Sequence, residues 1–397
     1  MQPVDGVIRL TETGRGSSCR VDLSADQARL LHESRVVDVT GGPKSWLIKS
    51  RSVVGVARVG DLEVWITPKI SISRLLFLVG YSSNPDVWRE GEIGLDEAAG
   101  LVPTVAQLFA RQVETAIAPG LLRGYRTEHQ SSYVMRGRLN VARQVTHHHG
   151  RVVPFEVEHD DYTPNIVENR FLLATIDRLL RLPGIGVARF ALEEQRSAMG
   201  SLVDPWAGSL IPRWQPTRLN NRYHSALRLA EVIWRASSPE YGPGSVQVSG
   251  FFFTMWKVFE DFITIALGER LLTATRIGHV DFQYHCKLDD EDEVNLYPDL
   301  VWWSNGKVSA VVDAKYKVEH KRDRNGLLFQ ILSYCVALDT KAGHLVYARS
   351  DQPSSRFTVK HAGIELHLHS VDLATSSLDD LRRQLDFLAD KVSGNQR

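Results

Sequence analysis

The amino-terminal part of the chain alternates apolar and polar residues at the spacing of β-strands. Between residues 7 and 70, glycine and proline separate six short runs of this kind: VIRL, CRVDL, VVDVT, SWLIKS, VVGVARVG and LEVWITPKI. Successive side chains of a strand point to opposite faces, so such runs favour half-buried strands. Residues 26–34 interrupt them with a short helical pattern. We therefore expect a β-rich domain over 1–95.

Helical spacing dominates the middle of the chain. Apolar residues recur every three to four positions in four segments: 71–79, 102–118, 165–182 and 218–235. The acidic run that ends near residue 97 predicts a linker, and SSPEYGPGS at 237–245 predicts a hinge. This pattern favours a mainly helical connector over 96–245.

The carboxy-terminal part of the chain contains both the alternating pattern of strands and the three-to-four-residue spacing of helices. FFFTMWKVFEDFITIALGERLL (251–272) predicts one strongly apolar helix, and HVDFQYHC (279–286) predicts a strand. Three later strand patterns precede a closing helix at 378–388. The order of these elements predicts an α/β domain over 246–397.

Two apolar runs inside this domain, 296–303 and 308–314, flank Ser-Asn-Gly, which is a hairpin signal. In an antiparallel pair, Asp299 near the start of one strand lies roughly opposite Asp313 near the end of the next. Lys315 follows Asp313 by two positions, so both side chains share a face. Two carboxylates and one amine therefore converge at one sheet edge.

Carboxylates that lie close together repel and raise each other's pKa, and a hard cation relieves this. Mg²⁺ takes oxygen ligands, usually one or two carboxylates, and leaves room for water and substrate phosphate. A lysine beside it stabilises negative charge or orients water. The set predicts metal-assisted phosphodiester hydrolysis. The plain alternative is a pair of solvated strand ends, against which the apolar strands on both sides argue.

Three further residues extend this site. Gln330 and Tyr334 are four apart on a predicted helix and share a face. Glu260 lies within the apolar run 251–272, where it is either a solvated helix position or a buried functional acid, and the sequence leaves both open. The acidic stretch 289–293 is predicted to be a solvated hairpin tip rather than a metal site.

Composition is that of an ordinary soluble protein of two or three domains: 397 residues, 43% hydrophobic and 24% charged. No apolar run reaches the roughly 18–20 residues of a membrane span, and the first residues do not resemble a secretory signal. Cys19, Cys286 and Cys335 lack metal-site spacing and indicate a reducing compartment. We expect a cytoplasmic protein with no membrane contact.

The formal net charge is zero, so a nuclease of this composition needs local basic surfaces or a partner to find nucleic acid. Residues 121–224 carry a modest excess of arginine over acids, and no lysine occurs between Lys69 and Lys257. A GC-rich genome explains the missing lysines more simply than selection for phosphate contacts. Arg136-Gly137-Arg138 suits phosphate or carboxylate contacts and equally suits a solvated turn.

Two other motifs are weak. His147, His148 and His149 are consecutive and do not easily converge on one ion, so they predict a solvated loop. GGPKS at 41–45 lacks the glycine spacing of a phosphate-binding loop and predicts a turn. We expect no nucleotide hydrolysis by this chain itself.

Pro298-Asp299 followed by Asp313-Ala314-Lys315 resembles the PD-(D/E)xK nuclease motif. More specifically, four segments resemble the McrC family, the nuclease subunit of McrBC-type modification-dependent (5-methylcytosine) restriction systems: MWKVFEDFI (255–263), YPDLVW (297–302), VVDAKYK (311–317) and QILSYCVAL (330–338). A weaker similarity extends upstream through VVGVARVGDLEVWITPKI, MRGRLN and DYTPNIVENR.

The resemblance implies a DNA endonuclease that works with an AAA+ GTPase hexamer, an McrB-like partner that recognises modified cytosine. It implies Asp299 and Asp313 as ligands of Mg²⁺ or Mn²⁺, Glu260 as an acid completing the metal shell, and Lys315 as the catalytic lysine. Gln330 and Tyr334 would position the site. The amino-terminal domain would engage the GTPase ring.

Two alternatives remain beside a partner-dependent endonuclease. One is a stand-alone repair or recombination nuclease, against which the neutral charge and the large non-nuclease half argue. The other is a non-catalytic adaptor that stimulates a GTPase, against which the intact Asp299, Asp313 and Lys315 set argues.

Overall fold

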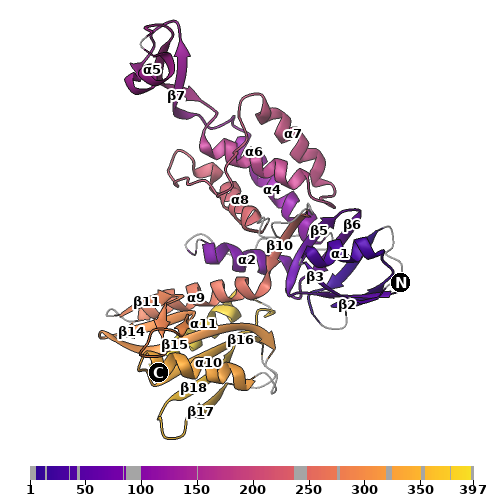
Figure 1. The fold of residues 1–397 in the computed structure, drawn as a ribbon, viewed down its shortest axis with the longest axis vertical. Coiled ribbons are helices and arrows are strands. Elements are labelled where there is room, and N and C mark those ends of the chain that lie inside the picture. Colours follow the sequence, from indigo (N-terminus) through magenta and orange to yellow (C-terminus); the bar gives the residue numbers. More distant parts are fainter. Residues whose placement is uncertain are drawn as a thin grey trace. The chain divides into compact units, whose positions relative to one another are not determined.

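The computed structural model describes residues 6–13, 16–34, 36–42, 45–83, 85, 100–149, 151–236, 248–274, 278–318, 324–349, 354–375 and 377–394. The chain forms two compact units. Unit 1 comprises Met1–Gly100, Tyr241–Val248 and Phe252–Arg397, and unit 2 comprises Leu101–Glu240 and Ser249–Phe251. The fold is mixed α/β (Figure 1).

The amino-terminal part of unit 1 contains the six expected strands: β1 (Val7–Thr11), β2 (Ser18–Val21), β3 (Val37–Gly42), β4 (Ser45–Ser50), β5 (Val53–Val59) and β6 (Leu62–Thr67). They form a sheet of order β1-β6-β5-β10, completed by β10 (Val248–Thr254), and a second sheet of order β2-β4-β3. Helix α1 (Ala25–Glu33) begins at a capping box made by Ser24 and Gln27. Leu31, Ile48 and Val64 are fully buried in the core between these elements.

The carboxy-terminal part of unit 1 is built on a six-stranded sheet of order β11-β14-β15-β16-β18-β17. Its strands are β11 (Gly278–Phe282), β14 (Leu300–Ser304), β15 (Lys307–Val318), β16 (Ala342–Arg349), β17 (Ser355–Thr358) and β18 (Glu365–Ser370). Strands β15, β16 and β18 run parallel, whereas β11, β14 and β17 pair antiparallel. A small ribbon of β12 (Cys286–Lys287) and β13 (Asn295–Leu296) encloses the acidic stretch 289–293, as expected for a hairpin tip.

Helices lie on both faces of this sheet. Helix α10 (Arg324–Ala337) packs on the face that carries Val311, Leu345 and Leu366. Helices α9 (Met255–Ala274) and α11 (Leu378–Ser393) pack on each other and on β15. Because side chains alternate along a strand, the residues between those of the α10 face, such as His344, point to the opposite face. The sheet is thus the middle of three layers.

The start of α9 corrects one expectation. The run 251–272 was predicted as a single helix, but Phe251–Thr254 belong to β10 and the helix begins at Met255. Aromatic residues favour strands that are buried on both faces, and Phe251, Phe252 and Phe253 are all buried. Because apolar residues lie on both sides of this boundary, the sequence does not show where the spacing of a strand changes to the spacing of a helix.

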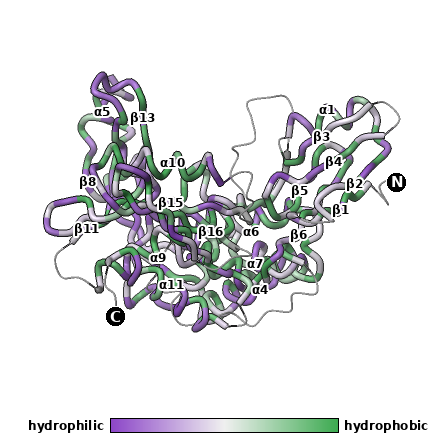
Figure 2. The backbone as a smooth tube through the Cα atoms, turned by 90° about the horizontal axis from the view of Figure 1, so that it is seen from below, coloured by the Kyte–Doolittle hydropathy of each residue, from purple (hydrophilic) through white to green (hydrophobic). Residues whose placement is uncertain are grey.

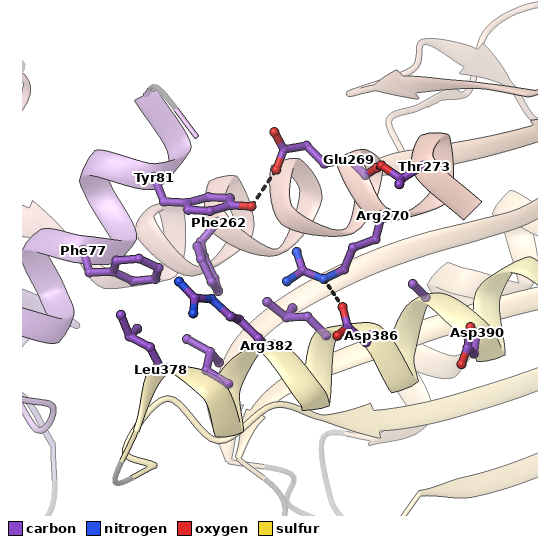
Figure 3. Close-up of a pocket in the computed structure, with 13 residues that line it drawn as sticks. Phe77, Tyr81, Phe262, Glu269, Arg270, Thr273, Leu378, Arg382, Asp386 and Asp390 are labelled. Atoms are coloured by element: carbon purple, nitrogen blue, oxygen red, sulfur yellow. Dashed lines mark hydrogen bonds and ion pairs between the residues drawn. The ribbon is translucent and has the colours of Figure 1, made fainter. Parts of the chain in front are cut away.

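Helix α2 (Ile72–Ser83) joins the two parts of unit 1. Its Phe77 and Tyr81 rings contact Phe262 of α9, and the Tyr81 hydroxyl donates a hydrogen bond to Glu269 at 2.5 Å (Figure 3). These residues line a cleft of about 770 Å³ between α2, α9 and α11. Arg74 of α2, buried from solvent, donates to the backbone oxygen of Leu373 at 2.9 Å.

Unit 2 combines a helical part with a small sheet. Its helices are α4 (Leu101–Ile117), α6 (Val167–Leu180), α7 (Ala188–Gly200) and α8 (His224–Ala236), the last preceded by a 3₁₀ turn η2 (Asn221–Tyr223). Hydrophobic residues recur along α4 (Figure 2). Strands β7 (Gly124–Ser132), β9 (Phe155–Thr163) and β8 (Arg138–Leu139) run out from these helices toward the short α5 (Val141–His148) (Figure 1).

The three consecutive histidines also correct an expectation. They were predicted in a solvated loop, but His147 and His148 end α5 and His149 is its left-handed C-cap residue, with φ of 47°. Asn140 caps the helix by accepting a hydrogen bond from the Arg143 amide. This cap and the buried partner of His148 stabilise a helical turn that the polar pattern did not predict.

Other expectations lie outside the described residues. These are the linker after residue 85, the hinge at 237–245 and the centre of the turn at 41–45. Among the residues that are described, no helix is long and apolar enough to cross a membrane.

Candidate active site

The β14–β15 hairpin brings the two predicted aspartates together. Asn305 and Gly306 both adopt positive φ, 54° and 75°, as a tight hairpin turn requires. Leu300 pairs with Val312 at the far end of the hairpin, so Asp299 and Asp313 are next to each other in register. An Asp299 carboxylate oxygen accepts a hydrogen bond from the Ala314 amide at 2.8 Å. The hairpin geometry thus matches the sequence prediction.

Lys315 and the two aspartates form the centre of the cluster. The Lys315 ammonium lies 2.6 Å from a carboxylate oxygen of Asp313. Asp313 is 1% and Asp299 5% exposed, whereas about a quarter of the Lys315 side chain is accessible. The alternative of solvated strand ends is therefore wrong for both aspartates, and the lysine is the part of the cluster that reaches solvent.

Glu260 approaches the same cluster from α9. The side-chain nitrogen of Gln283 donates to Glu260 at 2.7 Å and to Asp299 at 2.9 Å, so one amide joins the two carboxylates. Glu260 is therefore a partly buried acid beside Asp299 rather than a remote solvated helix position. Gln283 was not singled out by the sequence. No sequence pattern marks it, and only the structure shows its positive φ of 48° and its two carboxylate partners.

The carboxylates of the cluster oppose each other's ionisation. Burial and then the negative charge of Asp299 raise the pKa of Glu260 to about 7. The same two causes, in the same order, raise the pKa of Asp313 to about 6, although the ammonium of Lys315 acts against them. Such displaced pKa values with named charged neighbours are typical of functional sites.

Helix α10 supplies the last two predicted residues. The side-chain amide of Gln330 donates to the Tyr334 hydroxyl at 2.7 Å. Burial and then the charge of Asp313 raise the pKa of the Tyr334 phenol to about 12, which places this ring beside the carboxylates. All six residues singled out from the sequence therefore lie in or next to one cluster.

The neighbouring residue on β15 connects the site to the amino-terminal strands. The Tyr316 hydroxyl forms a hydrogen bond with Glu12, which is 1% exposed and follows β1. Burial, followed by the charge of Glu12, raises the pKa of the Tyr316 phenol far above its usual range. Strand β15, which carries Asp313 and Lys315, thus contacts both the amino-terminal and the carboxy-terminal part of unit 1.

The donor set fits a hard divalent cation. Carboxylates that raise each other's pKa are relieved by added positive charge, and oxygen is the ligand that Mg²⁺ and Mn²⁺ prefer. Within the described residues, no group of three or more His, Cys, Asp or Glu side chains is arranged as a metal site by itself. Asp299, Asp313 and Glu260 therefore do not form a closed three-ligand site by themselves, and a cation there would take further oxygen ligands from water and substrate.

Comparisons with known proteins agree with the sequence resemblance. Residues 48–348 match the family model described as McrBC 5-methylcytosine restriction system component. The fold is similar to a chain in the refined half-complex from the tetradecameric assembly of Thermococcus gammatolerans McrB AAA+ hexamers with bound McrC. The TM-score is 0.60 and the identity 21%, over 96% of this chain and 100% of that one.

A second structure, the cryo-EM structure of the Thermococcus gammatolerans McrBC complex, is a weaker likeness. It has a TM-score of 0.41 and 22% identity over 67% of this chain and 88% of that chain. No curated protein matches. The first of these likenesses supports a mixed α/β fold shared with that chain.

Proposed function

Because the chain belongs to the McrBC 5-methylcytosine restriction system component family, we propose that it is the DNA-cleaving subunit of such a system. The observation that carries this proposal is the buried cluster of Asp299, Asp313 and Lys315 with Glu260 at its margin. Its spacing resembles the PD-(D/E)xK motif, and its position on the β14–β15 hairpin supports the proposal of a nuclease core.

The reaction is hydrolysis of a phosphodiester. Water adds to phosphorus, the bond to one ester oxygen breaks, and the products are a phosphate monoester and a hydroxyl. Asp299 and Asp313 would hold Mg²⁺ or Mn²⁺, with Glu260 completing the set of oxygen ligands. When bound, this ion supplies Lewis acidity at the phosphate and lowers the pKa of water.

The chain's own side chains then have separate tasks. Lys315, whose ammonium is partly accessible, stabilises the negative charge that develops on the phosphate. Gln283 fixes the distance between Glu260 and Asp299. Gln330 orients the Tyr334 hydroxyl beside the cluster. Each cluster of this kind cuts one strand, so a double-strand break requires two copies.

We further propose an AAA+ GTPase partner that contacts the amino-terminal strands and recognises modified cytosine. Support comes from the family and from the fold shared with a chain of an assembly that contains McrB AAA+ hexamers. The zero net charge of this chain also favours delivery of DNA by a partner over capture by its own field.

The test is cleavage of methylated and unmethylated plasmid with Mg²⁺, by the chain alone and together with its genomic AAA+ neighbour and GTP. We expect cutting only in the complete mixture with methylated DNA, and loss of cutting in Asp299→Ala and Lys315→Met. Asp281→Asn, which changes a carboxylate on β11 that is 39% exposed, is the matched control.

The other outcomes identify the alternatives. Strong cutting by the chain alone favours a stand-alone nuclease. No cutting in any mixture, while the neighbour's GTPase rate still rises, shows a non-catalytic adaptor and contradicts the proposal.

A further inference from the structure

A cavity of about 570 Å³ lies in unit 2, where β7 begins and α6 begins. Its walls come from the first residues of β7, the first turn of α6 and the irregular segment 213–220. Four arginines line it: Arg123, Arg126, Arg170 and Arg213. The only acidic residue in its lining is Glu168. In a chain with no net charge, this is a strong local excess of positive charge.

Backbone carbonyls hold three of the four guanidinium groups in place. The pairs are Arg123 with Tyr162 at 3.2 Å, Arg126 with Asn165 at 3.2 Å and Arg170 with Asp204 at 3.3 Å. A carbonyl oxygen orients a guanidinium without neutralising it, and a guanidinium has five donors, so further donors remain for a ligand. The arginines are therefore pre-positioned and retain their charge.

The remaining charges of the cavity do not cancel this excess. Arg213 is exposed and makes no hydrogen bond or ion pair with any residue that the structure describes. Arg126 also lies 3.1 Å from Glu128, which offsets part of one charge. Glu168 accepts a hydrogen bond from the Asn220 amide at 3.1 Å, so one of its oxygens is occupied.

Helix α6 adds backbone donors to the same cavity. It has 14 residues, and its N-cap residue Ile166 makes no side-chain cap hydrogen bond. The first amides of a helix lack intrahelical partners and carry partial positive charge. The Ile166 amide already donates to the Pro164 carbonyl at 2.8 Å, so these donors begin at Val167, which lines the cavity.

Aromatic side chains give the cavity a second chemical character. Tyr125 is 79% exposed, although its ring contacts Tyr162. Trp214 also lines the cavity; its indole nitrogen donates a hydrogen bond to Glu231 at 2.7 Å, and its ring contacts His224. A guanidinium group can donate two parallel hydrogen bonds to phosphate oxygens, and an aromatic ring can stack on a base. Together these two interactions bind nucleotide units.

We propose that this cavity binds a phosphate-bearing nucleotide unit, with the phosphate on the four arginines and the base against Tyr125 or Trp214. The unit belongs either to a nucleic-acid strand or to a free nucleotide, because both present the same chemistry. The residues of this site belong to unit 2, whereas those of the carboxylate cluster belong to unit 1. Its occupancy does not depend on the proposed nuclease activity.

The test is fluorescence anisotropy with the full chain in EDTA, so that binding is measured without cleavage. The probes are a labelled single strand of about 20 nucleotides, the corresponding duplex and a fluorescent GTP analogue. Arg213→Glu reverses a charge inside the cavity. Arg218→Glu reverses a charge in the same segment that does not line the cavity and is the matched control.

We expect Arg213→Glu to weaken binding of at least one probe by roughly tenfold or more, because a charge-assisted hydrogen bond is lost. Arg218→Glu should change it less than threefold. If the nucleic-acid strand is the ligand, one phosphate contact is lost. The slope of the logarithm of the binding constant against the logarithm of the salt concentration then also falls by about one. Loss confined to the GTP analogue identifies a free nucleotide instead.

Three results would overturn the proposal. The first is equal weakening of probe binding by both variants. The second is binding of none of the three probes by the wild type. The third is unchanged probe binding in Arg213→Glu; if association of the AAA+ partner is lost at the same time, the cavity is a protein-binding surface.

Discussion

Two buried carboxylates of this molecule have opposite electrostatic surroundings. Asp313 in unit 1 and Glu156 in unit 2 are each 1% exposed. The pKa of Asp313 is raised to about 6 by burial and by the charge of Asp299. The pKa of Glu156 is lowered to about 2, first by hydrogen bonds from Ser131 and His148 and then by the charge of Arg143.

The difference lies in what surrounds each group. The Glu156 side chain lies between donors and cations, with His148 at 2.9 Å and Arg143 at 3.3 Å, so its charge is satisfied inside the fold. Asp313 has one cation, Lys315, and a second carboxylate close by. We infer that Glu156 stabilises the α5 region, whereas Asp313 is kept under electrostatic strain that an added cation relieves.

The substitution expected to have the largest effect on this contrast is Asp313→Asn. We expect cleavage by the complete system to fall roughly a hundredfold to a thousandfold, because a ligand and its charge are lost. Without divalent cation, the thermal midpoint should stay equal or rise, because like-charge repulsion is removed. Cleavage assays and calorimetry measure the two effects. A loss of cleavage that comes with a large loss of stability would contradict the idea of a strained site.

Gln283→Leu tests how the cluster is held together. Removing the amide that joins Glu260 and Asp299 should lower cleavage by about tenfold, since small displacements of reacting groups are costly. It should also raise the Mg²⁺ concentration needed for half-maximal rate. A Mg²⁺ titration of the rate checks both. Unchanged rate and unchanged Mg²⁺ dependence would show that Gln283 has no positioning role.

Glu156→Gln tests the satisfied carboxylate. The isosteric amide leaves Arg143 and His148 without their negative partner, and we expect the thermal midpoint to fall by a few °C. Cleavage chemistry at the carboxylate cluster should persist at temperatures where the variant is folded. Calorimetry and far-ultraviolet circular dichroism follow the change, and an unchanged midpoint would refute a stabilising role.

The smallest effects are the pH dependences, which have opposite signs. The folded pKa of Glu156 lies below its ordinary 4.5, so its contribution to stability is present above pH 4.5 and is lost as pH falls toward 2. The folded pKa of Asp313 lies above its ordinary 3.8, so its contribution is present below pH 3.8 and is lost as pH rises through about 6.

The two variants should reveal these slopes in thermal denaturation without divalent cations. The midpoint of Asp313→Asn should gain on the wild type between about pH 4 and 6. The deficit of Glu156→Gln should shrink between about pH 4.5 and 2. Parallel curves for either variant and the wild type would contradict the corresponding pKa shift.

The sequence predicted the hairpin site well because each signal was local. Asn305-Gly306 specifies the turn, and the spacing of Asp313 and Lys315 specifies their shared face. The six strands before residue 70 follow from simple alternation in the same way. Such features depend on few residues and are read directly from the order of the chain.

What escaped prediction depends on contacts between distant residues. Gln283 is ordinary in sequence, and its role depends on α9 and the segment just before β14, which bring Glu260 and Asp299 to it. The arginine cavity draws on segments some ninety residues apart, from Arg123 to Arg213. Neither is encoded by a local period.

Unit 1 is built mainly from two stretches of chain, one before and one after most of unit 2, and this has a consequence for synthesis. Arg74 bonds to Leu373, 299 residues further along, and α2 packs on α9. Unit 2 lies mostly between these stretches, so on the ribosome it emerges whole before unit 1 has its second half. The amino-terminal sheet cannot be completed during synthesis until the residues of β10 are made, because β10 is the neighbour of β5 in that sheet. A chain truncated within unit 2 therefore exposes the unpaired edge of β5. We expect chaperones and proteases to recognise this edge.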